Sequence, residues 1–110
     1  TVSDNIIYVP VSTTGKRGMQ ISSGDAVVKN NKIYLLPGSC GTGIYSYQKG
    51  GIIRDNQIIN LGSAPCGTGI RLQPSAVNTQ VFGNTLINLG NPIRLMNSSA
   101  PNTIGVNIIQ

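Results

Sequence analysis

An asparagine recurs along this chain at intervals close to 25 residues, each time between two apolar residues. The pattern is an apolar residue, then Asn three positions later, then an apolar residue two further on. Its five copies are Val2/Asn5/Ile7, Val28/Asn31/Ile33, Ile53/Asn56/Ile58, Val81/Asn84/Leu86 and Ile104/Asn107/Ile109. The intervals of 26, 25, 28 and 23 residues between the asparagines are the signature of a repeat architecture.

A second series keeps step with the first. A turn residue precedes a short apolar–x–apolar stretch in Gly18-Met19-Gln20-Ile21, Gly43-Ile44-Tyr45-Ser46, Gly69-Ile70-Arg71-Leu72 and Pro92-Ile93-Arg94-Leu95. Each repeat thus holds three apolar stretches that are too short and too β-branched for helices. We predict an all-β, single-stranded parallel β-helix, a solenoid of about four rungs of 23–28 residues each.

Turn chemistry supports stacked rungs. The residues before the repeated asparagines are Asp4, Asn30, Asp55, Gly83 and Val106. The first four tolerate the left-handed backbone that a sharp bend between strands requires. We interpret the asparagines as an inward ladder in which each side-chain amide bonds to the next rung, with no ligand needed.

The repeated pattern with bend residues before each Asn resembles the right-handed parallel β-helix of the pectin-lyase-like superfamily. That group includes pectate lyases, polygalacturonases, mannuronate epimerases and bacteriophage tailspikes, and the resemblance covers essentially the whole chain, residues 1–110. It implies a polysaccharide partner, an extracellular or virion-surface location and, from the tailspikes, a homotrimer. Because the sequence opens at Thr1 in strand-like residues and shows no caps, we expect residues 1–110 to be a segment of a longer β-helix or to be completed by partner chains.

One outer strand face gathers candidate binding residues. The register places the alternating set Met19/Ile21, Ile44/Ser46, Ile70/Leu72 and Ile93/Leu95 inward, and the set Gln20/Ser22, Tyr45/Tyr47, Arg71/Gln73 and Arg94/Met96 outward. Aromatic faces stack on sugar rings and arginine grips carboxylates with two hydrogen bonds. The predicted carbohydrate-binding residues are Tyr45, Tyr47, Arg71 and Arg94, and the alternative is that they are ordinary exposed strand residues.

A second outward row carries four apolar residues in register, namely Tyr8, Tyr34, Ile59 and Ile87. A row of this kind is not expected to face water uncovered. We expect it to form a contact between subunits, with a loop that crosses it as the alternative.

Composition restricts the chemistry. The chain has no His and three acidic residues against eight basic ones, a net charge of +5. Without His there is no Ser-His or Cys-His nucleophile pair, and we predict no metal and no cofactor. Asp4 and Asp55 occupy equivalent bends two rungs apart, a marginal spacing for a pair of catalytic carboxylates, and bends favour Asp for backbone reasons. The acidic motifs of polygalacturonases and pectate lyases have no match, so the catalytic residues remain unknown and would lie outside this chain.

The basic residues form no cluster with aromatic ones, so we predict no nucleic-acid partner, while their diffuse charge favours an acidic polysaccharide. No apolar run approaches the roughly 20 residues of a membrane span, and no membrane partner is expected. Three functions stay open: carbohydrate recognition in a tailspike-like or polysaccharide-degrading protein, a structural stalk, adhesin or assembly module without ligand, and an autonomous lyase or hydrolase.

The pentapeptide Cys40-Gly41-Thr42-Gly43-Ile44 returns unchanged at residues 66–70. No helix or P-loop lysine follows its glycines, so we interpret them as a tight turn. The equivalent positions of Cys40 and Cys66 on adjacent rungs are compatible with a disulfide, but an in-register pair tends to have the wrong Cβ geometry. We therefore favour two stacked free thiols.

Overall fold

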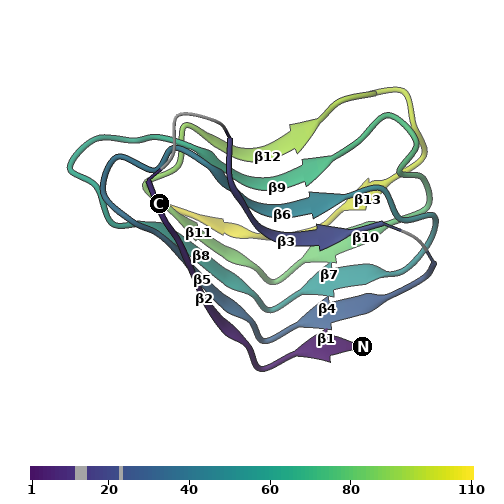
Figure 1. The fold of residues 1–110 in the computed structure, drawn as a ribbon. Coiled ribbons are helices and arrows are strands. Elements are labelled where there is room, and N and C mark those ends of the chain that lie inside the picture. The colour runs from purple at the N-terminus through teal and green to yellow at the C-terminus, as the bar shows by residue number, and fades with distance from the viewer. Residues whose placement is uncertain (12–14, 23) are drawn as a thin grey trace.

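The computed structural model describes residues 1–11, 15–22 and 24–110, and within them the chain is a parallel β-solenoid without helices. Three parallel sheets run along its length, and the chain visits them in turn as it climbs (Figure 1). Sheet A contains β1 (Val2–Ser3), β4 (Val27–Lys29), β7 (Ile52–Arg54), β10 (Gln80–Phe82) and β13 (Thr103–Ile104). Sheet B contains β2 (Ile6–Val9), β5 (Lys32–Leu35), β8 (Gln57–Asn60), β11 (Thr85–Ile87) and β14 (Ile108–Ile109). Sheet C contains β3 (Arg17–Ile21), β6 (Thr42–Ser46), β9 (Thr68–Leu72) and β12 (Asn91–Leu95).

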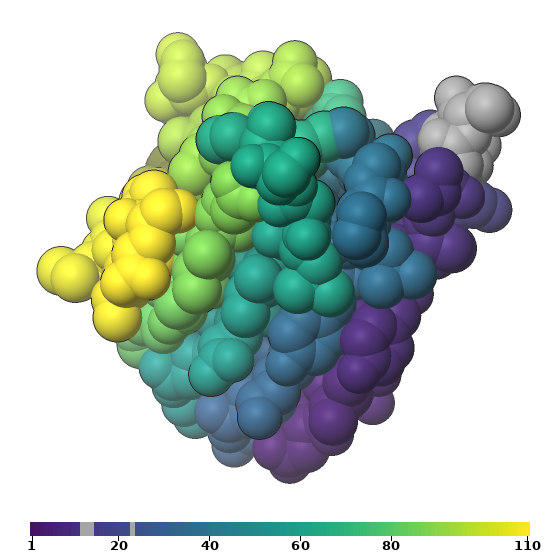
Figure 2. All heavy atoms as spheres, turned by 90° about the vertical axis from the view of Figure 1, so that its left-hand side faces the viewer, coloured from purple at the N-terminus to yellow at the C-terminus, as the bar shows by residue number. Residues whose placement is uncertain are grey.

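The rungs stack in the predicted register. Val28 pairs with Ile53, Ile33 with Ile58, and Ile44 with Ile70, each one repeat apart. Successive rungs appear as bands that run from purple to yellow across the molecule (Figure 2). The predicted fold of about four rungs is therefore confirmed. Among the described residues no helix is long and apolar enough to span a membrane.

Inward-facing aliphatic side chains fill the solenoid. The paired residues of sheets A and B on the inner rungs are fully buried: Val28, Ile53 and Val81 in one column, and Ile33, Ile58 and Leu86 in the other. In sheet C, Ile44 and Ile70 are equally enclosed, whereas Ile93 and Leu95 on the last strand are half-buried. Burying one such side chain stabilises the fold by about 1.5–3 kcal/mol, so the stack of columns holds the rungs together.

The asparagine ladder has the predicted form. The backbone N–H and the Nδ2 of Asn31 both donate to Oδ1 of Asn56, each at 3.0 Å. Asn56 donates in the same way to Asn84, and Asn84 to Asn107. The bend residues before four of the asparagines, Asp4, Asn30, Asp55 and Gly83, have positive φ angles of 61°, 55°, 57° and 69°. The bend and the ladder thus form one device that turns the chain from sheet A into sheet B.

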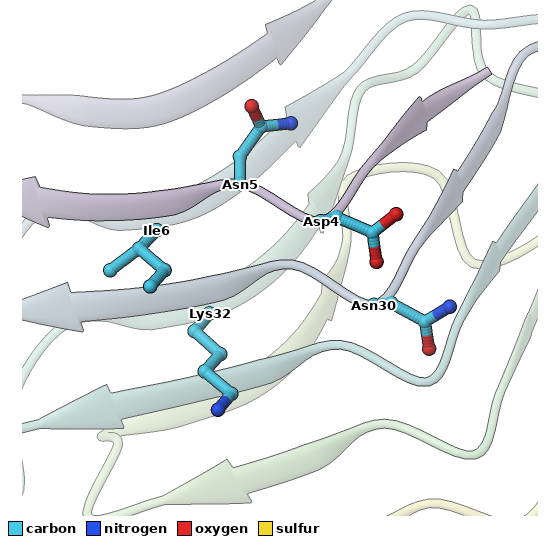
Figure 3. Close-up of a pocket in the computed structure, with 5 residues that line it drawn as sticks. All are labelled: Asp4, Asn5, Ile6, Asn30 and Lys32. Atoms are coloured by element: carbon cyan, nitrogen blue, oxygen red, sulfur yellow. The ribbon is translucent and has the colours of Figure 1, made fainter.

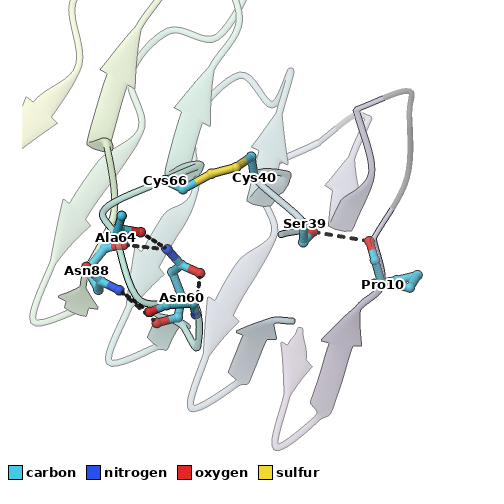
Figure 4. Close-up of a disulfide and its surroundings, with 8 residues drawn as sticks. Pro10, Ser39, Cys40, Asn60, Ala64, Cys66 and Asn88 are labelled. Carbon is cyan, nitrogen blue, oxygen red and sulfur yellow. Dashed lines mark hydrogen bonds between the residues drawn. A yellow bond between two sulfur atoms is a disulfide. The ribbon is translucent and has the colours of Figure 1, made fainter. Parts of the chain in front are cut away.

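The two cysteines form a disulfide, so the prediction of free thiols was wrong. Cys40 and Cys66 lie with their Cα atoms 4.9 Å apart and bridge the turns that precede β6 and β9 (Figure 4). Cys40 has a left-handed backbone, with φ at 46°, and Cys66 does not. The two side chains therefore do not leave parallel backbones, and the geometric objection to an in-register pair does not apply.

Candidate functional site

The outer face of sheet C brings three of the four predicted binding residues into one column. Gln20 pairs with Tyr45, Tyr45 with Arg71, and Arg71 with Arg94. The flanking turn residues Tyr47 and Gln73 follow β6 and β9 directly, and Arg17 opens β3. We call this surface the outer patch; it comprises Arg17, Gln20, Tyr45, Tyr47, Arg71, Gln73 and Arg94.

Tyr45 lies on the outer face but is covered by its neighbours. Its side chain is 7% exposed, although it lies outside the aliphatic core. The guanidinium carbon of Arg17 stands 3.5 Å from the centre of the ring, and that of Arg71 stands 5.1 Å from it. Cation–π contacts of this kind orient a guanidinium as well as hold it. Tyr45 faces outward as predicted, but two arginines from the adjacent strands lie against its ring and shield it from solvent.

Arg17 is a member of the patch that the sequence pattern did not reveal. It is exposed, lies against Tyr45 and donates a hydrogen bond to Oε1 of Gln20. Simple alternation from Met19 places Arg17 on the inward side, and the alternation does not hold at the start of β3. The sequence signal that could have revealed Arg17 is a basic residue at the start of the first strand of sheet C.

Tyr47 is the half-buried aromatic ring of the patch. Its centre lies 5.3 Å from that of Tyr45, and the two rings are tilted by 57°. The hydrogen bond with the Tyr45 side chain raises the pKa of Tyr47 above its ordinary value of 10.0, with a further rise from desolvation. Arg17 opposes these effects and lowers the same pKa. Tyr47 is therefore a neutral hydrogen-bonding group throughout the physiological range of pH.

A hollow of about 340 Å³ adjoins the patch where sheet C ends. Its lining includes Ser22, Gly24, Tyr47 and Lys49. Hydroxyl and ammonium groups thus border the ring of Tyr47. The combination of one aromatic ring with a few polar groups is typical of small-ligand subsites.

Two nitrogen atoms of the patch have no hydrogen-bond acceptor among the described residues. They are the buried Nε of Arg71 and the buried Nε2 of Gln73, which belong to the same stretch of chain. A buried donor without an acceptor costs about 1–3 kcal/mol. Both donors are enclosed, like the unpartnered side-chain amide of Gln48 inside the solenoid, so they do not by themselves mark a ligand site.

The acidic residues do not form a second site. Asp4 and Asp55 occupy bends two rungs apart, with Asn30 between them, and Asp55 pairs with Arg54 at 2.6 Å. Asp4 and Asn30 project from successive bends beside Lys32, around a hollow of about 220 Å³ (Figure 3). Within the described residues no three His, Cys, Asp or Glu side chains lie close enough together to hold a metal ion.

A family model described as "right handed beta helix region" matches residues 1–109. The chain belongs to this family. No curated protein and no solved structure shows a significant match to the β-helix.

Membership establishes the right-handed β-helix, and the strand pairing places Tyr45, Arg71 and Arg94 in one outward column. The activity has to be argued from the outer patch itself, because one β-helical scaffold can carry unrelated sites.

Proposed function

We propose that this β-helix recognises carbohydrate through the outer patch, as a segment of a tailspike-like or polysaccharide-degrading protein. The observation that carries the proposal is the column of Tyr45, Arg71 and Arg94, joined by Arg17 from the neighbouring strand. Three guanidinium groups and the ring of Tyr47 then share one face. The location that fits this role is extracellular or on a virion surface, and a disulfide such as Cys40–Cys66 is stable in such oxidising surroundings.

The charges of the patch favour an acidic polysaccharide. Arg17, Arg71 and Arg94 belong to the patch and no carboxylate does. Guanidinium groups bind carboxylates or sulfates with paired hydrogen bonds, which are about twice as strong as neutral ones. The net charge of +5 adds a long-range attraction for such polymers.

The residues of the outer patch have different roles in the proposed binding. Tyr45 holds the guanidinium groups of Arg17 and Arg71 in place, so it acts as a positioning residue. Tyr47 offers the ring that stacks on a sugar, and Arg94, which is exposed, offers an accessible positive charge. If the whole protein depolymerises its ligand, its acid and base lie outside these residues, because the patch contains no carboxylate.

A structural module without ligand is the second candidate, and one observation favours it. The inner Asn ladder is satisfied entirely by the protein, so the repeated residues of the scaffold need no ligand. The two candidates differ in what they predict for the outer patch, since only carbohydrate recognition requires its guanidinium groups to bind a ligand.

Titration with defined oligosaccharides tests the proposal. We expect oligogalacturonate to bind and an uncharged galactose oligomer of equal length to bind more weakly, as measured by isothermal calorimetry. Arg71→Ala and Arg94→Ala each remove a charged hydrogen bond and should weaken binding about tenfold or more. Arg54→Ala is the matched control, because it removes an arginine that is half-buried like Arg71 but lies on sheet A.

The loss of oligosaccharide binding in each variant distinguishes carbohydrate recognition from a structural module. Equal weakening by Arg54→Ala and Arg71→Ala would show that charge alone attracts the oligomer, and the assigned site would be wrong. No measurable binding of acidic or neutral oligomers would favour the structural module.

A further inference from the structure

Two arginines cover the ring of Tyr45, and they are held to different degrees. Arg71 pairs in register with Tyr45, is half-buried and has a buried Nε. Arg17 is exposed and opens β3. Its guanidinium carbon nevertheless stands closer to the centre of the ring, at 3.5 Å against 5.1 Å for that of Arg71. Arg17 is therefore both the nearer cover and the one that is free to move into solvent.

We propose that Arg17 is a removable cover over the ring of Tyr45 and determines the preference of the outer patch for acidic polysaccharides. A carboxylate of the ligand pairs with the guanidinium of Arg17 and draws it away, and the uncovered ring then stacks on a sugar of the same ligand. An uncharged polysaccharide has no group that draws Arg17 away. This inference rests on the proposed function, because it assigns the choice between acidic and neutral ligands to one residue of that site.

The contacts that hold Arg17 in the free chain are weak. They are the ring of Tyr45 and a hydrogen bond to Oε1 of Gln20, both at an exposed position, and the hydroxyl of Tyr47 lies close enough for Arg17 to lower its pKa. All three partners are uncharged. Cation–π contacts at exposed sites are weak, whereas paired hydrogen bonds to a carboxylate are about twice as strong as neutral ones. A ligand carboxylate therefore competes well for the guanidinium.

No carboxylate of the protein opposes this exchange within the part of the chain that the structure describes. The one ion pair there joins Arg54 to Asp55 on another sheet. The charge of Arg17 is thus available to an anionic ligand, and no ion pair has to break before it moves.

Gln20 gives the cover a defined closed position. Its Nε2 donates to Oγ of Ser22, which turns its Oε1 toward Arg17. Gln20 also pairs in register with Tyr45, so the residue that holds the guanidinium lies beside the ring that the guanidinium covers. The closed position is therefore set by neighbouring residues of β3 and β6.

The ring beneath the cover adds a second stacking surface to the outer patch. The centre of the Tyr45 ring lies 5.3 Å from that of Tyr47, at a tilt of 57°. When Arg17 moves, two neighbouring aromatic rings face the ligand instead of one, and aromatic rings supply large apolar contact areas. A neutral ligand reaches the second ring only by breaking the contacts of Arg17 without replacing them. Specificity then arises from a cost that only the neutral ligand bears.

Arg17→Ala tests this assignment, because it removes the cover together with the charge. In isothermal calorimetry the variant should bind oligogalacturonate more weakly and the uncharged galactose oligomer more tightly than the unaltered chain does. The ratio of the two affinities should fall about tenfold or more. Lys16→Ala is the matched control, since it removes the same charge from the adjacent exposed residue. It should weaken binding of the acidic oligomer at most slightly and bring no gain for the neutral one.

A second measurement follows the cover itself. In carbon NMR of ring-labelled tyrosine, with Tyr45→Phe to assign the signal, an uncharged paramagnetic agent in solution should broaden the Tyr45 signal more in Arg17→Ala than in the unaltered chain or in Lys16→Ala. In the unaltered chain, oligogalacturonate should reduce the ring-current shift of the Arg17 side chain, and the neutral oligomer should not. Circular dichroism checks the fold, and Arg17→Gln repeats both measurements if the alanine variant is unfolded.

The outcomes separate this inference from the proposed function. An unaltered chain that binds neither oligomer contradicts the proposed function. An unaltered chain that binds oligogalacturonate, together with an Arg17→Ala variant that shows no gain for the neutral oligomer, overturns only the role of Arg17. A Tyr45 ring that stays shielded from the paramagnetic agent in Arg17→Ala overturns it as well, because other residues would then cover the ring.

Discussion

The repeated asparagine is suited to its position because it both donates and accepts at the same corner. Its backbone N–H and Nδ2 converge on one Oδ1 of the next rung, while its own Oδ1 receives the same pair from the rung before. Asp could not supply the side-chain donor, and Leu could supply neither group. The side chains are buried on the inner rungs, so each missing bond leaves a buried polar group unsatisfied.

Replacing one inner asparagine should therefore be costly. Asn56→Leu leaves the buried backbone N–H of Asn31 without its acceptor. It also removes three side-chain hydrogen bonds, namely those with Nδ2 of Asn31, Oδ1 of Asn84 and the carbonyl of Val28. We expect the free energy of unfolding to fall by about 3 kcal/mol, because a buried group that loses its partner costs about 1–3 kcal/mol and each lost hydrogen bond adds to that. Urea unfolding monitored by circular dichroism measures the loss.

Asn5→Leu provides the matched control at the exposed first rung, where the side chain is open to water. Its effect should be clearly smaller than that of Asn56→Leu. Equal losses at the two positions would contradict the ladder as the source of the stability.

Tyr47 allows a test of the outer patch that needs no ligand. The hydrogen bond with Tyr45 is the largest cause of its raised pKa, so Tyr45→Phe should lower the pKa of Tyr47 toward 10.0. The raised pKa favours the neutral phenol in the folded state. Its contribution to stability is therefore present below pH 10 and is lost as the pH rises through the raised pKa of Tyr47.

Carbon NMR of ring-labelled tyrosine resolves this titration, with Tyr47→Phe to assign the signal. Tyr34→Phe serves as the control, since Tyr34 lies on sheet B and should leave the Tyr47 titration unchanged. A pKa of Tyr47 that does not move in Tyr45→Phe would show that the two side chains are not hydrogen-bonded.

At the scale of the element, the disulfide fastens two neighbouring strands of sheet C at their starts. It closes a loop of 26 residues between the turns before β6 and β9. A cross-link of this length removes entropy from the unfolded chain worth about 3 kcal/mol. The double variant Cys40→Ser/Cys66→Ser should lower the melting temperature by several degrees, as calorimetry can show.

A reducing agent separates this effect from that of the substitutions. Treatment with dithiothreitol should lower the melting temperature of the unaltered chain and leave that of the double variant unchanged. A chain whose stability does not respond to the reducing agent would not contain the bond.

The elements could be predicted from the sequence because the signal is repeated. Five copies of one pattern fix the register, and alternation within each strand then places Ile44 inward and Arg71 outward. The pattern does not indicate which side chains contact residues of a neighbouring rung. Arg17 covers Tyr45 from another repeat, and the left-handed φ of Cys40 makes the disulfide possible. Neither the Arg17–Tyr45 contact nor the left-handed backbone of Cys40 follows from the repeated sequence pattern.

At the scale of the molecule, the outward row of sheet B remains partly open. Tyr8 and Tyr34 stack with ring centres 5.3 Å apart, Tyr8 is 61% exposed, and Ile59 and Ile87 are half-buried. We propose that this row is a side-by-side contact between three chains, which is what the resemblance of the repeats to tailspikes implies.

Ile59→Lys places a charge in the middle of the row and should reduce a three-chain mass in light scattering to that of one chain, because burying an unpaired charge in a contact is costly. Gln57→Lys, two residues earlier on the same strand and already polar, should leave the mass unchanged. A mass that responds to neither variant would place the contact elsewhere.

The stacking of each rung only on its neighbours also has a consequence for synthesis on the ribosome. Each newly made stretch of about 25 residues pairs with the stretch made just before it, as Val28 does with Val2 and Ile53 with Val28. No strand has to wait for a partner made much later. At roughly 5–20 residues per second, a new rung emerges every few seconds onto a finished template. The order of translation can thus become the order of folding, and an incomplete chain differs from the finished one mainly in height.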